Sequence, residues 1–363
     1  MKNTYRGEDL TPIDLQPTWT IATGNYNVHY SQPTLMDNVL YVGTYTQSSP
    51  QSEDDFTFYA LDMTTGEYLW SLPMSSHVLS SLAINGTIYV LSHNELCAVD
   101  PSARKRLWSL PLNALSGLSL RAFQNTLYAS SAREVYAIDA ATGRLQWTYT
   151  CARNVYAVCL VADLLVLGVS YGRNAQEGAL IAIDAVTGKK RWSFPAVYCL
   201  VSSVVQADGV VYSGAGNGVL RAFAGATGEE LWSLRIDRRI RYGPTLANKR
   251  VYVGSWDGKV RSGQSCLIDS RQDRGTLHAI DPAAQQFLWS LPFQGMLWTA
   301  PLAENDRLYA CATDGRLHVI DAMTGKRLYT MLIGAFLSLI VQNSTAFIVN
   351  GNKLYALHLP ENI

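Results

Sequence analysis

The chain of 363 residues repeats one short pattern eight times, and this repeat constrains its fold more than any other feature. The clearest copy, residues 135–147, contains an alanine-centred run, an aspartate, a Thr-Gly turn and a tryptophan. In seven copies an aspartate, or an alanine in its place, precedes an aromatic residue by eight positions: Asp62/Trp70, Asp100/Trp108, Asp139/Trp147, Asp184/Trp192, Ala224/Trp232, Asp281/Trp289 and Asp321/Tyr329. The eighth copy has His358 at the aspartate position. A period near 40 residues indicates a propeller or another repeat array.

Each copy predicts four short strands. In the second copy the strands are expected at residues 79–84, 87–92, 95–100 and 106–110. The Asn85-Gly86 pair between the first two tolerates the positive φ of a tight hairpin turn. In five copies the last turn carries a glycine, which suits a left-handed position. In four of these five copies it follows an aspartate that can accept hydrogen bonds from turn amides. Arg104 and Gln285 replace this glycine in two copies, so we expect those two turns to differ.

Eight such units predict an all-β fold, an eight-bladed β-propeller of four-stranded antiparallel blades. We expect one domain over residues 1–363, with an N-terminal extension (1–15), a closing strand (16–21) and blades over 22–360. The last copy supplies three strands between residues 333 and 358, so its fourth is expected from the N-terminal stretch around Trp19. A small alanine two residues before each aspartate, replaced once by Val319, should let neighbouring sheets approach closely.

The motifs YALDMTTGEYLW, YAIDAATGRLQW, IAIDAVTGKKRW and HVIDAMTGKRLY resemble the repeat of the pyrroloquinoline-quinone-like (PQQ-like) propellers. This superfamily includes quinoprotein alcohol dehydrogenases, a periplasmic lipoprotein that assists outer-membrane barrel assembly, and sensor domains of bacterial kinases. The resemblance covers residues 16–360 and implies the fold rather than one function, because members without the cofactor carry the same repeat. The adjacent cysteines and the calcium set of Glu, Asn and Asp that the quinoproteins use are not recognisable here. We therefore expect no PQQ, no other cofactor and no metal.

Composition narrows the possible partners. Lys plus Arg and Asp plus Glu number 29 each, so the net charge is zero and the basic surplus of a duplex-binding protein is missing. No apolar run approaches the ~20 residues of a membrane span. The first residues lack a secretion leader, which predicts a cytoplasmic protein, and we expect a monomer. The six cysteines are expected to be reduced core thiols, and Cys151 near Arg153 is the one candidate for reactivity.

Strand order predicts where a site would lie. The second-to-third loops and the inter-blade loops share one end of the blades, the loop-bearing end, and the remaining turns share the turn end. Every sizeable insertion falls at the loop-bearing end, at residues 45–57, 171–178 and 259–275. Because function concentrates on variable loops carried by a rigid frame, we expect a small molecule or a protein partner to bind there. The alternative is that these loops are insertions that the fold tolerates and that have no function.

The candidate ligand-binding residues lie where the inner strands meet that end. Their register places Tyr30, Arg241, Trp298 and either Val155 or Tyr156 around the channel entrance, where aromatic rings and one guanidinium would hold a planar or anionic ligand. The alternative is that the aromatic rings plug the channel. Two further candidates are Arg238, from the arginine-rich residues 235–244, and Trp256. For Arg238 the alternative is that the arginine-rich loop pairs with the acidic residues 53–55. For Trp256 the alternative is that the ring anchors the neighbouring insertion.

His29 and His77 occupy matching positions in consecutive copies, where two imidazoles would bind a metal or transfer protons. No third ligand matches them in register. The alternative is that the two histidines occupy matching positions by coincidence and form no site. His278 and His318 stand where other copies have tyrosine and are expected to be packing residues. The predicted function is a non-catalytic binding or scaffold propeller. The alternatives are a cofactor-free lyase or cyclase that uses Tyr, His and Arg at the channel mouth, or a PQQ-dependent oxidoreductase.

Overall fold

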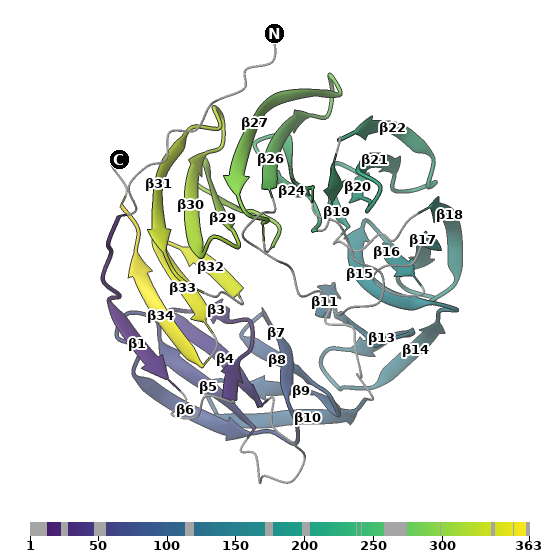
Figure 1. Ribbon diagram of the computed structural model, residues 1–363. Coiled ribbons are helices and arrows are strands. Elements are labelled where there is room, and N and C mark those ends of the chain that lie inside the picture. The colour runs from purple at the N-terminus through teal and green to yellow at the C-terminus, as the bar shows by residue number, and fades with distance from the viewer. Residues whose placement is uncertain are drawn as a thin grey trace. The chain divides into compact units, whose positions relative to one another are not determined.

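The computed structural model describes residues 13–22, 28–46, 56–112, 120–170, 177–197, 204–236, 238–240, 242–257, 274–297, 299–334, 338–350 and 352–360. Within these residues every element is a β-strand, and the strands form eight antiparallel sheets (Figure 1). The sheets are the blades of an eight-bladed β-propeller, which confirms the fold class predicted from the repeat. The chain divides into two compact units, residues 15–155 with 335–362 and residues 1–14 with 156–334 and Ile363.

The first unit contains blades one, two, three and eight. Its strands are β2 (Val28–Tyr30), β3 (Thr34–Met36), β4 (Val39–Thr46), β5 (Thr57–Asp62) and β6 (Tyr68–Pro73) in blade one; β7 (Val78–Ile84), β8 (Thr87–Ser92), β9 (Glu95–Asp100) and β10 (Lys105–Pro111) in blade two; β11 (Leu120–Phe123), β12 (Thr126–Ser130), β13 (Glu134–Asp139) and β14 (Leu145–Thr150) in blade three; and β32 (Ser338–Gln342), β33 (Thr345–Asn350), β34 (Lys353–His358) and β1 (Trp19–Ala22) in blade eight.

The second unit contains blades four to seven. Its strands are β15 (Asn154–Val161), β16 (Leu164–Ser170), β17 (Glu177–Asp184) and β18 (Lys190–Val197) in blade four; β19 (Val205–Ala207), β20 (Val210–Gly214), β21 (Val219–Ala224) and β22 (Glu230–Arg235) in blade five; β23 (Arg239–Ile240), β24 (Thr245–Ala247), β25 (Arg250–Trp256), β26 (Arg274–Asp281) and β27 (Gln286–Gln294) in blade six; and β28 (Leu302–Glu304), β29 (Arg307–Cys311), β30 (Arg316–Asp321) and β31 (Arg327–Leu332) in blade seven.

Blades one and six have five strands because the inner strand is interrupted. β2 and β3 both pair with β4, and β23 and β24 both pair with β25. The interruptions contain Pro33 and Pro244, which have no backbone N–H to donate to a neighbouring strand. The inner strand therefore leaves the ladder for a few residues and rejoins it.

The two ends of the chain meet in blade eight. β1 pairs antiparallel with β34, with Trp19 opposite Ala356 and Ala22 opposite Lys353, so the purple and yellow ends of the chain lie side by side in Figure 1. The Trp19 indole contacts the Phe347 ring with centroids 6.0 Å apart. The N-terminal strand therefore supplies the fourth strand of the last blade, as the unpartnered Trp19 predicted.

The repeated alanine faces the repeated aromatic residue within each blade. The cross-strand pairs are Ala60–Trp70, Ala98–Trp108, Ala137–Trp147, Ala182–Trp192, Ala222–Trp232, Ala279–Trp289, Val319–Tyr329 and Ala356–Trp19. Directly opposed residues of an antiparallel pair have neighbouring side chains, so a small residue leaves room for a large ring. In the blade where valine replaces alanine, tyrosine replaces tryptophan. The alanine thus makes room for the indole of its own blade.

Four of the indoles, those of Trp19, Trp108, Trp192 and Trp289, also join their blade to the next by a hydrogen bond to a backbone carbonyl. Trp108 Nε1 donates to the Ala140 carbonyl at 3.0 Å, and its ring lies where a Cβ on Gly143 would come within 2.6 Å of it. Trp289 bonds Ala322 in the same way at 3.2 Å and packs on Gly325. The hydrophobic cores correspondingly lie between consecutive blades; one of them joins Leu277 of blade six to Leu308 of blade seven. The turn position thus favours glycine for two reasons: its φ is near +73°, and a side chain there would collide with the indole.

The two turns without glycine keep the same backbone conformation, so the expectation that they differ is wrong for the backbone. Arg104 and Gln285 have φ of 54° and 55°, in the left-handed region. What differs is the orientation of the tryptophan ring in the preceding blade, which packs against the turn. Trp108 and Trp289, which face glycine turns, make interplanar angles of 41° and 40° with their tyrosines, whereas the corresponding angles are 54° for Trp70 and 56° for Trp232. A side chain in the turn therefore goes with a rotated indole in the preceding blade.

Replacing Arg104 with glycine is expected to raise the free energy of unfolding by up to about 1 kcal/mol. A non-glycine residue costs about 1–2 kcal/mol in the left-handed region, and the extra chain entropy of glycine offsets about 0.5–1 kcal/mol of that gain. Chemical denaturation measures the change. The matched control is Gly143→Ala, which places a Cβ within 2.6 Å of the Trp108 ring and must lower the stability. A loss of stability in Arg104→Gly would contradict this account of the turn.

Candidate functional site

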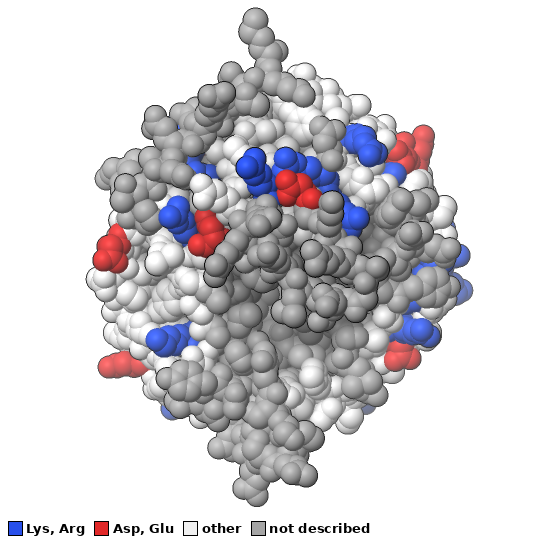
Figure 2. All heavy atoms as spheres, in the orientation of Figure 1, with Lys and Arg blue, Asp and Glu red and all other residues white. Residues whose placement is uncertain are grey.

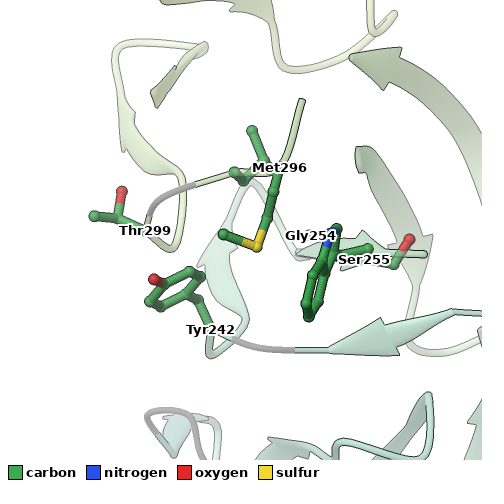
Figure 3. Close-up of a pocket in the computed structure, with 7 residues that line it drawn as sticks. Tyr242, Gly254, Ser255, Met296 and Thr299 are labelled. Atoms are coloured by element: carbon green, nitrogen blue, oxygen red, sulfur yellow. The ribbon is translucent and has the colours of Figure 1, made fainter. Parts of the chain in front are cut away.

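A small apolar recess lies on blade six, where the inner strand is interrupted. It is lined by Tyr242, Gly254, Ser255, Trp256, Met296, Leu297 and Thr299. Tyr242 comes from the break between β23 and β24, the next three residues end β25, and the last three follow β27. Figure 3 shows the Met296 thioether reaching toward the Tyr242 ring, with Ser255 on the far side. We call this group the blade-six recess.

Blade seven holds the wall of the recess in place. Met296 N donates to Thr313 Oγ1 at 2.9 Å, and Thr313 N donates to the Met296 carbonyl at 2.8 Å. Leu297 then forms a bridge with Ala312, which places its side chain against Gly254. A Cβ on Gly254 would lie 2.8 Å from Leu297 Cδ1, so only glycine allows the segment to come this close. Trp256, Met296 and Leu297 are all more than nine-tenths buried.

The recess is a shallow depression that is open to solvent and has room for little more than a water molecule. It is too small to enclose a whole small molecule, because pockets that do so usually have about 300–1,000 Å³. A shallow apolar depression with polar groups around it is compatible with the surface of a protein interface.

Three arginines stand beside the recess at the loop-bearing end. Arg238 Nη1 lies 3.0 Å from Asp257 Oδ2 and donates to the Arg274 carbonyl at 3.3 Å. Arg274 N donates to Asp257 Oδ1 at 2.8 Å, and Arg239 pairs across the sheet with Trp256. We call Arg238, Arg239 and Arg274 the arginine collar. Figure 2 shows basic spheres gathered around an acidic group over β24 and β26.

The structure brings two of the predicted site residues together, Arg238 and Trp256. Trp256 lines the recess, and the observed ionic partner of Arg238 is Asp257, adjacent to Trp256. Arg241 and Trp298 lie outside the described residues, as does the acidic segment 53–55, so the predicted channel-entrance cluster and the loop pairing stay predictions. Tyr30 and His29 are placed only by their backbone in β2. Tyr156 is half-buried in β15 of blade four and belongs to neither the recess nor the collar.

Sequence reasoning missed Tyr242, Met296 and Leu297. The signal for Tyr242 was present in the Tyr-Gly-Pro run, which interrupts a strand, and in Gly254 on the strand opposite. Met296 and Leu297 carry no such signal because they follow an outer strand of their blade and reach the recess only through bonds to Thr313. Asp257, the ionic partner of Arg238, was not predicted either, although it follows Trp256 directly in the sequence.

His77 contacts side chains that the repeat register did not suggest. Its ring centroid lies 4.5 Å from that of Phe56 and 5.1 Å from that of His93. Burial, followed by the charge of His77, lowers the pKa of His93 below its usual value. In the part of the chain that the structure describes, no three His, Cys, Asp or Glu side chains are grouped as metal ligands. The predicted pairing of His77 with His29 remains untested, since the His29 side chain is not described.

Glu95 is the centre of a polar network at the loop-bearing end of blade two. Its carboxylate accepts hydrogen bonds from Ser75 Oγ at 2.8 Å and Ser109 Oγ at 2.6 Å, and Arg106 Nη1 lies 3.2 Å away. Arg106 Nη2 donates in turn to the Pro73 carbonyl at 2.6 Å. Burial raises the pKa of Glu95, but the two serine hydrogen bonds and the Arg106 charge outweigh it and hold the pKa below its usual value. The network therefore favours the ionised carboxylate.

This network predicts a contribution to stability that depends on pH. Because the pKa of Glu95 is lower in the folded than in the unfolded chain, its contribution is present above the unfolded value of about 4.3 and is lost as the pH falls through the folded value. Glu95→Gln should lower the free energy of unfolding at pH 7 by about 1–3 kcal/mol. The free energy of unfolding of the variant should also decrease less than that of the wild type as the pH is lowered. Urea denaturation between pH 7 and pH 3 measures both. The exposed Glu67→Gln is the control, and equal acid slopes in the two variants would contradict the prediction.

The remaining candidates are core residues. Cys151, the one candidate for reactivity, is 3 % exposed, and burial raises its pKa to about 11, so it is buried like the other core thiols. The described cysteines Cys97, Cys159 and Cys311 are also buried, reduced thiols, as expected for core residues. His278 bonds Ser255 and Ser290, and buried His318 bonds Asp314, which confirms both as packing residues. No helix long and apolar enough to cross a bilayer occurs among the described residues.

Comparison with known proteins places this geometry in a family. A family model described as outer membrane protein assembly factor BamB matches residues 16–150, 96–203, 199–269 and 216–358. BamB of Moranella endobia is 23% identical over 314 residues, which cover 76% of either chain. BamB of Yersinia pestis is 23% identical over 64% of this chain and 61% of its own. The kinase AfsK of Streptomyces griseus is 22% identical over 73% of this chain but only 32% of its own.

Solved structures show the same fold at low identity. BamB from Moraxella catarrhalis superposes with a TM-score of 0.68 at 14% identity, covering 96% of this chain and 100% of its own. A computationally designed protein, Ika8, gives 0.72 at 15% identity, covering 97% and 100%. A europium-containing methanol dehydrogenase gives 0.67 at 13% identity, covering 92% and 84%. At these identities the likeness shows the propeller and carries no activity to this chain.

The expectation of a cytoplasmic protein is wrong, because several relatives are outer membrane protein assembly factors and point to the cell envelope. The repeat that determines the fold contains no signal for a compartment, which is why the sequence pattern could not supply one. The expectation of a binding propeller agrees at a coarse level with these relatives. Repeat, blades and family match lead to one conclusion: the chain belongs to the BamB-type family of PQQ-like β-propellers.

Proposed function

We propose that this chain is a protein-binding scaffold of the cell envelope that assists the assembly of outer membrane proteins, and that it binds its partner through the blade-six recess and the arginine collar. The family match supports the biological role. The observation that carries the mode of action is the recess itself, which combines a shallow apolar depression with a charged rim. An apolar centre surrounded by polar groups is the usual anatomy of a protein interface.

The rigid frame explains how such a surface would work. Gly254 and the Met296–Thr313 bonds fix the recess on strands of two consecutive blades, so little conformational entropy is lost when a partner binds. The exposed guanidinium groups at the rim would donate hydrogen bonds to a partner and set its orientation. The protein then acts by holding a partner, with no covalent step.

Complementation of a bacterial strain that lacks its own BamB tests this role. Expression of the wild-type chain, with its export confirmed, is expected to restore the level of folded outer membrane proteins. The double variant Arg239→Glu/Arg274→Glu should restore much less, although both residues are exposed and the fold should persist. The matched control Arg144→Glu/Lys189→Glu makes the same charge change at exposed positions of the turn end. Failure of the exported wild-type protein to complement would overturn the proposed function.

A further inference from the structure

Two histidines of blade two lie directly opposite each other at the loop-bearing end. Val78 pairs with Ser92 in the ladder between β7 and β8, and one step further along His93 N donates to the His77 carbonyl at 3.1 Å. His77 and His93 are therefore a directly opposed cross-strand pair, whose side chains project from the same face of the hairpin. Their ring centroids are 5.1 Å apart, with an interplanar angle of 59°.

This separation matches that of two imidazoles that bind the same metal ion. An imidazole nitrogen lies about 2.0–2.1 Å from a bound zinc ion, and tetrahedral coordination then places the centroids of two such rings about 5 Å apart. The observed distance of 5.1 Å between the His77 and His93 rings agrees with this value. Imidazole is a ligand for copper, nickel and zinc ions, and copper(II) binds most tightly in this series. The pair thus supplies two adjacent ligands without a rearrangement of the backbone.

The surrounding residues hold the two rings in place. The Phe56 ring lies against the His77 ring, with centroids 4.5 Å apart. Asn94 N donates to Ser76 Oγ at 3.2 Å, which adds a second bond between the segments that carry His77 and His93. Because the two rings are already positioned, little conformational entropy is lost when an ion binds between them.

The two histidines are accessible, and His93 is in the protonation state that a metal requires. Both are half-buried rather than enclosed, so an ion from solvent reaches them. Burial, followed by the charge of His77, lowers the pKa of His93, so this ring is neutral at pH 7, as a ligand must be. Glu95 follows two residues later, but its carboxylate already binds two serines and Arg106. The described residues therefore offer two ligands here, and water takes the other positions.

We propose that His77 and His93 together bind one divalent transition-metal ion, most tightly copper(II), with water in the remaining coordination positions. The inference goes beyond the proposed function and does not depend on it. The sequence suggested His29 as the neighbour of His77, whereas the contact in the described part of the chain is with His93. The proposed site also departs from the sequence-based expectation that the protein holds no metal.

Isothermal titration calorimetry of the purified full-length protein with zinc chloride or copper(II) chloride tests the proposal. His77→Phe and His93→Phe each keep an aromatic ring but remove the ligand nitrogens, and each should weaken binding at this site about tenfold or more. The exposed His358→Ala is the control and should bind like wild type. An excess of calcium, which prefers oxygen ligands, should not displace zinc. Binding should also weaken between pH 7 and pH 5, because protons compete for the imidazoles.

Two further measurements separate a lost site from a lost fold. Melting temperatures in the presence of a chelator show whether the variants fold, and added zinc should raise the melting temperature of wild type more than that of His93→Phe or His93→Gln. Electron paramagnetic resonance of the copper(II) protein should show coupling to two nitrogens that His77→Phe/His93→Phe loses. Equal affinity of folded wild type and both single phenylalanine variants would overturn the proposal. So would loss of binding in His29→Ala with retention in His93→Phe.

Discussion

Replacing Trp289 with alanine is expected to lower the free energy of unfolding by about 3–5 kcal/mol, the usual cost of removing a buried tryptophan. The Trp289 side chain is 6 % exposed and belongs to the core between blades six and seven. Its loss would leave a cavity between Tyr252 and Gly325 and remove the bond to the Ala322 carbonyl. Because this one ring joins two blades, the effect should appear as a lower melting temperature of the whole second unit.

Circular dichroism during thermal and urea denaturation measures this change. Trp289→Phe keeps most of the apolar ring and should be destabilised less than the alanine variant. Leu231→Ala, at a position 48 % exposed on an outer strand, is the control and should change the stability by no more than about 0.5 kcal/mol. A Trp289→Ala protein as stable as the Leu231→Ala protein would show that the indole does not hold the blades together.

Deleting residues 1–22 is expected to remove most of the stability of the first unit. The deletion takes away strand β1, its pairing with β34 and the buried Trp19 ring, whose Nε1 donates to the Met63 carbonyl at 3.1 Å. The indole contributes about 3–5 kcal/mol and each lost backbone hydrogen bond about 1 kcal/mol. Their sum is comparable with the stability of an ordinary domain, about 5–15 kcal/mol. The exposed edge of β34 would also invite association between copies.

Addition of the missing strand in trans provides the control for this deletion. A synthetic peptide of residues 13–22 should raise the melting temperature of the truncated protein with increasing peptide concentration, because it binds the folded state. The same peptide with Trp19→Ala should have little effect, since it lacks the ring that contacts Phe347. A truncated protein that melts like the full chain would contradict the closure of blade eight by the N-terminal strand.

The candidate site was predictable only in part. Arg238 and Trp256 were both selected from sequence, and they lie beside each other because β23 pairs with β25. The His77 environment was not predicted, since His93 reaches it from the bend between β8 and β9. Cys151 was the candidate for reactivity because Arg153 is near it in the sequence, whereas packing buries it like the other core thiols. In each case the deciding contact joins residues that the repeat does not relate.

The sequence by itself determined the blade. The spacing of alanine, aspartate, glycine and tryptophan establishes four short strands, a left-handed turn and a cross-strand pair, and the unpartnered Trp19 determines how blade eight is completed. Tertiary structure alone decided the blade-six recess, the partner of Arg238 and the network around Glu95. The physical reason is that strands and turns depend on neighbours a few residues apart, which a repeat records. These sites depend on packing between strands and blades at breaks and loops, where no period exists.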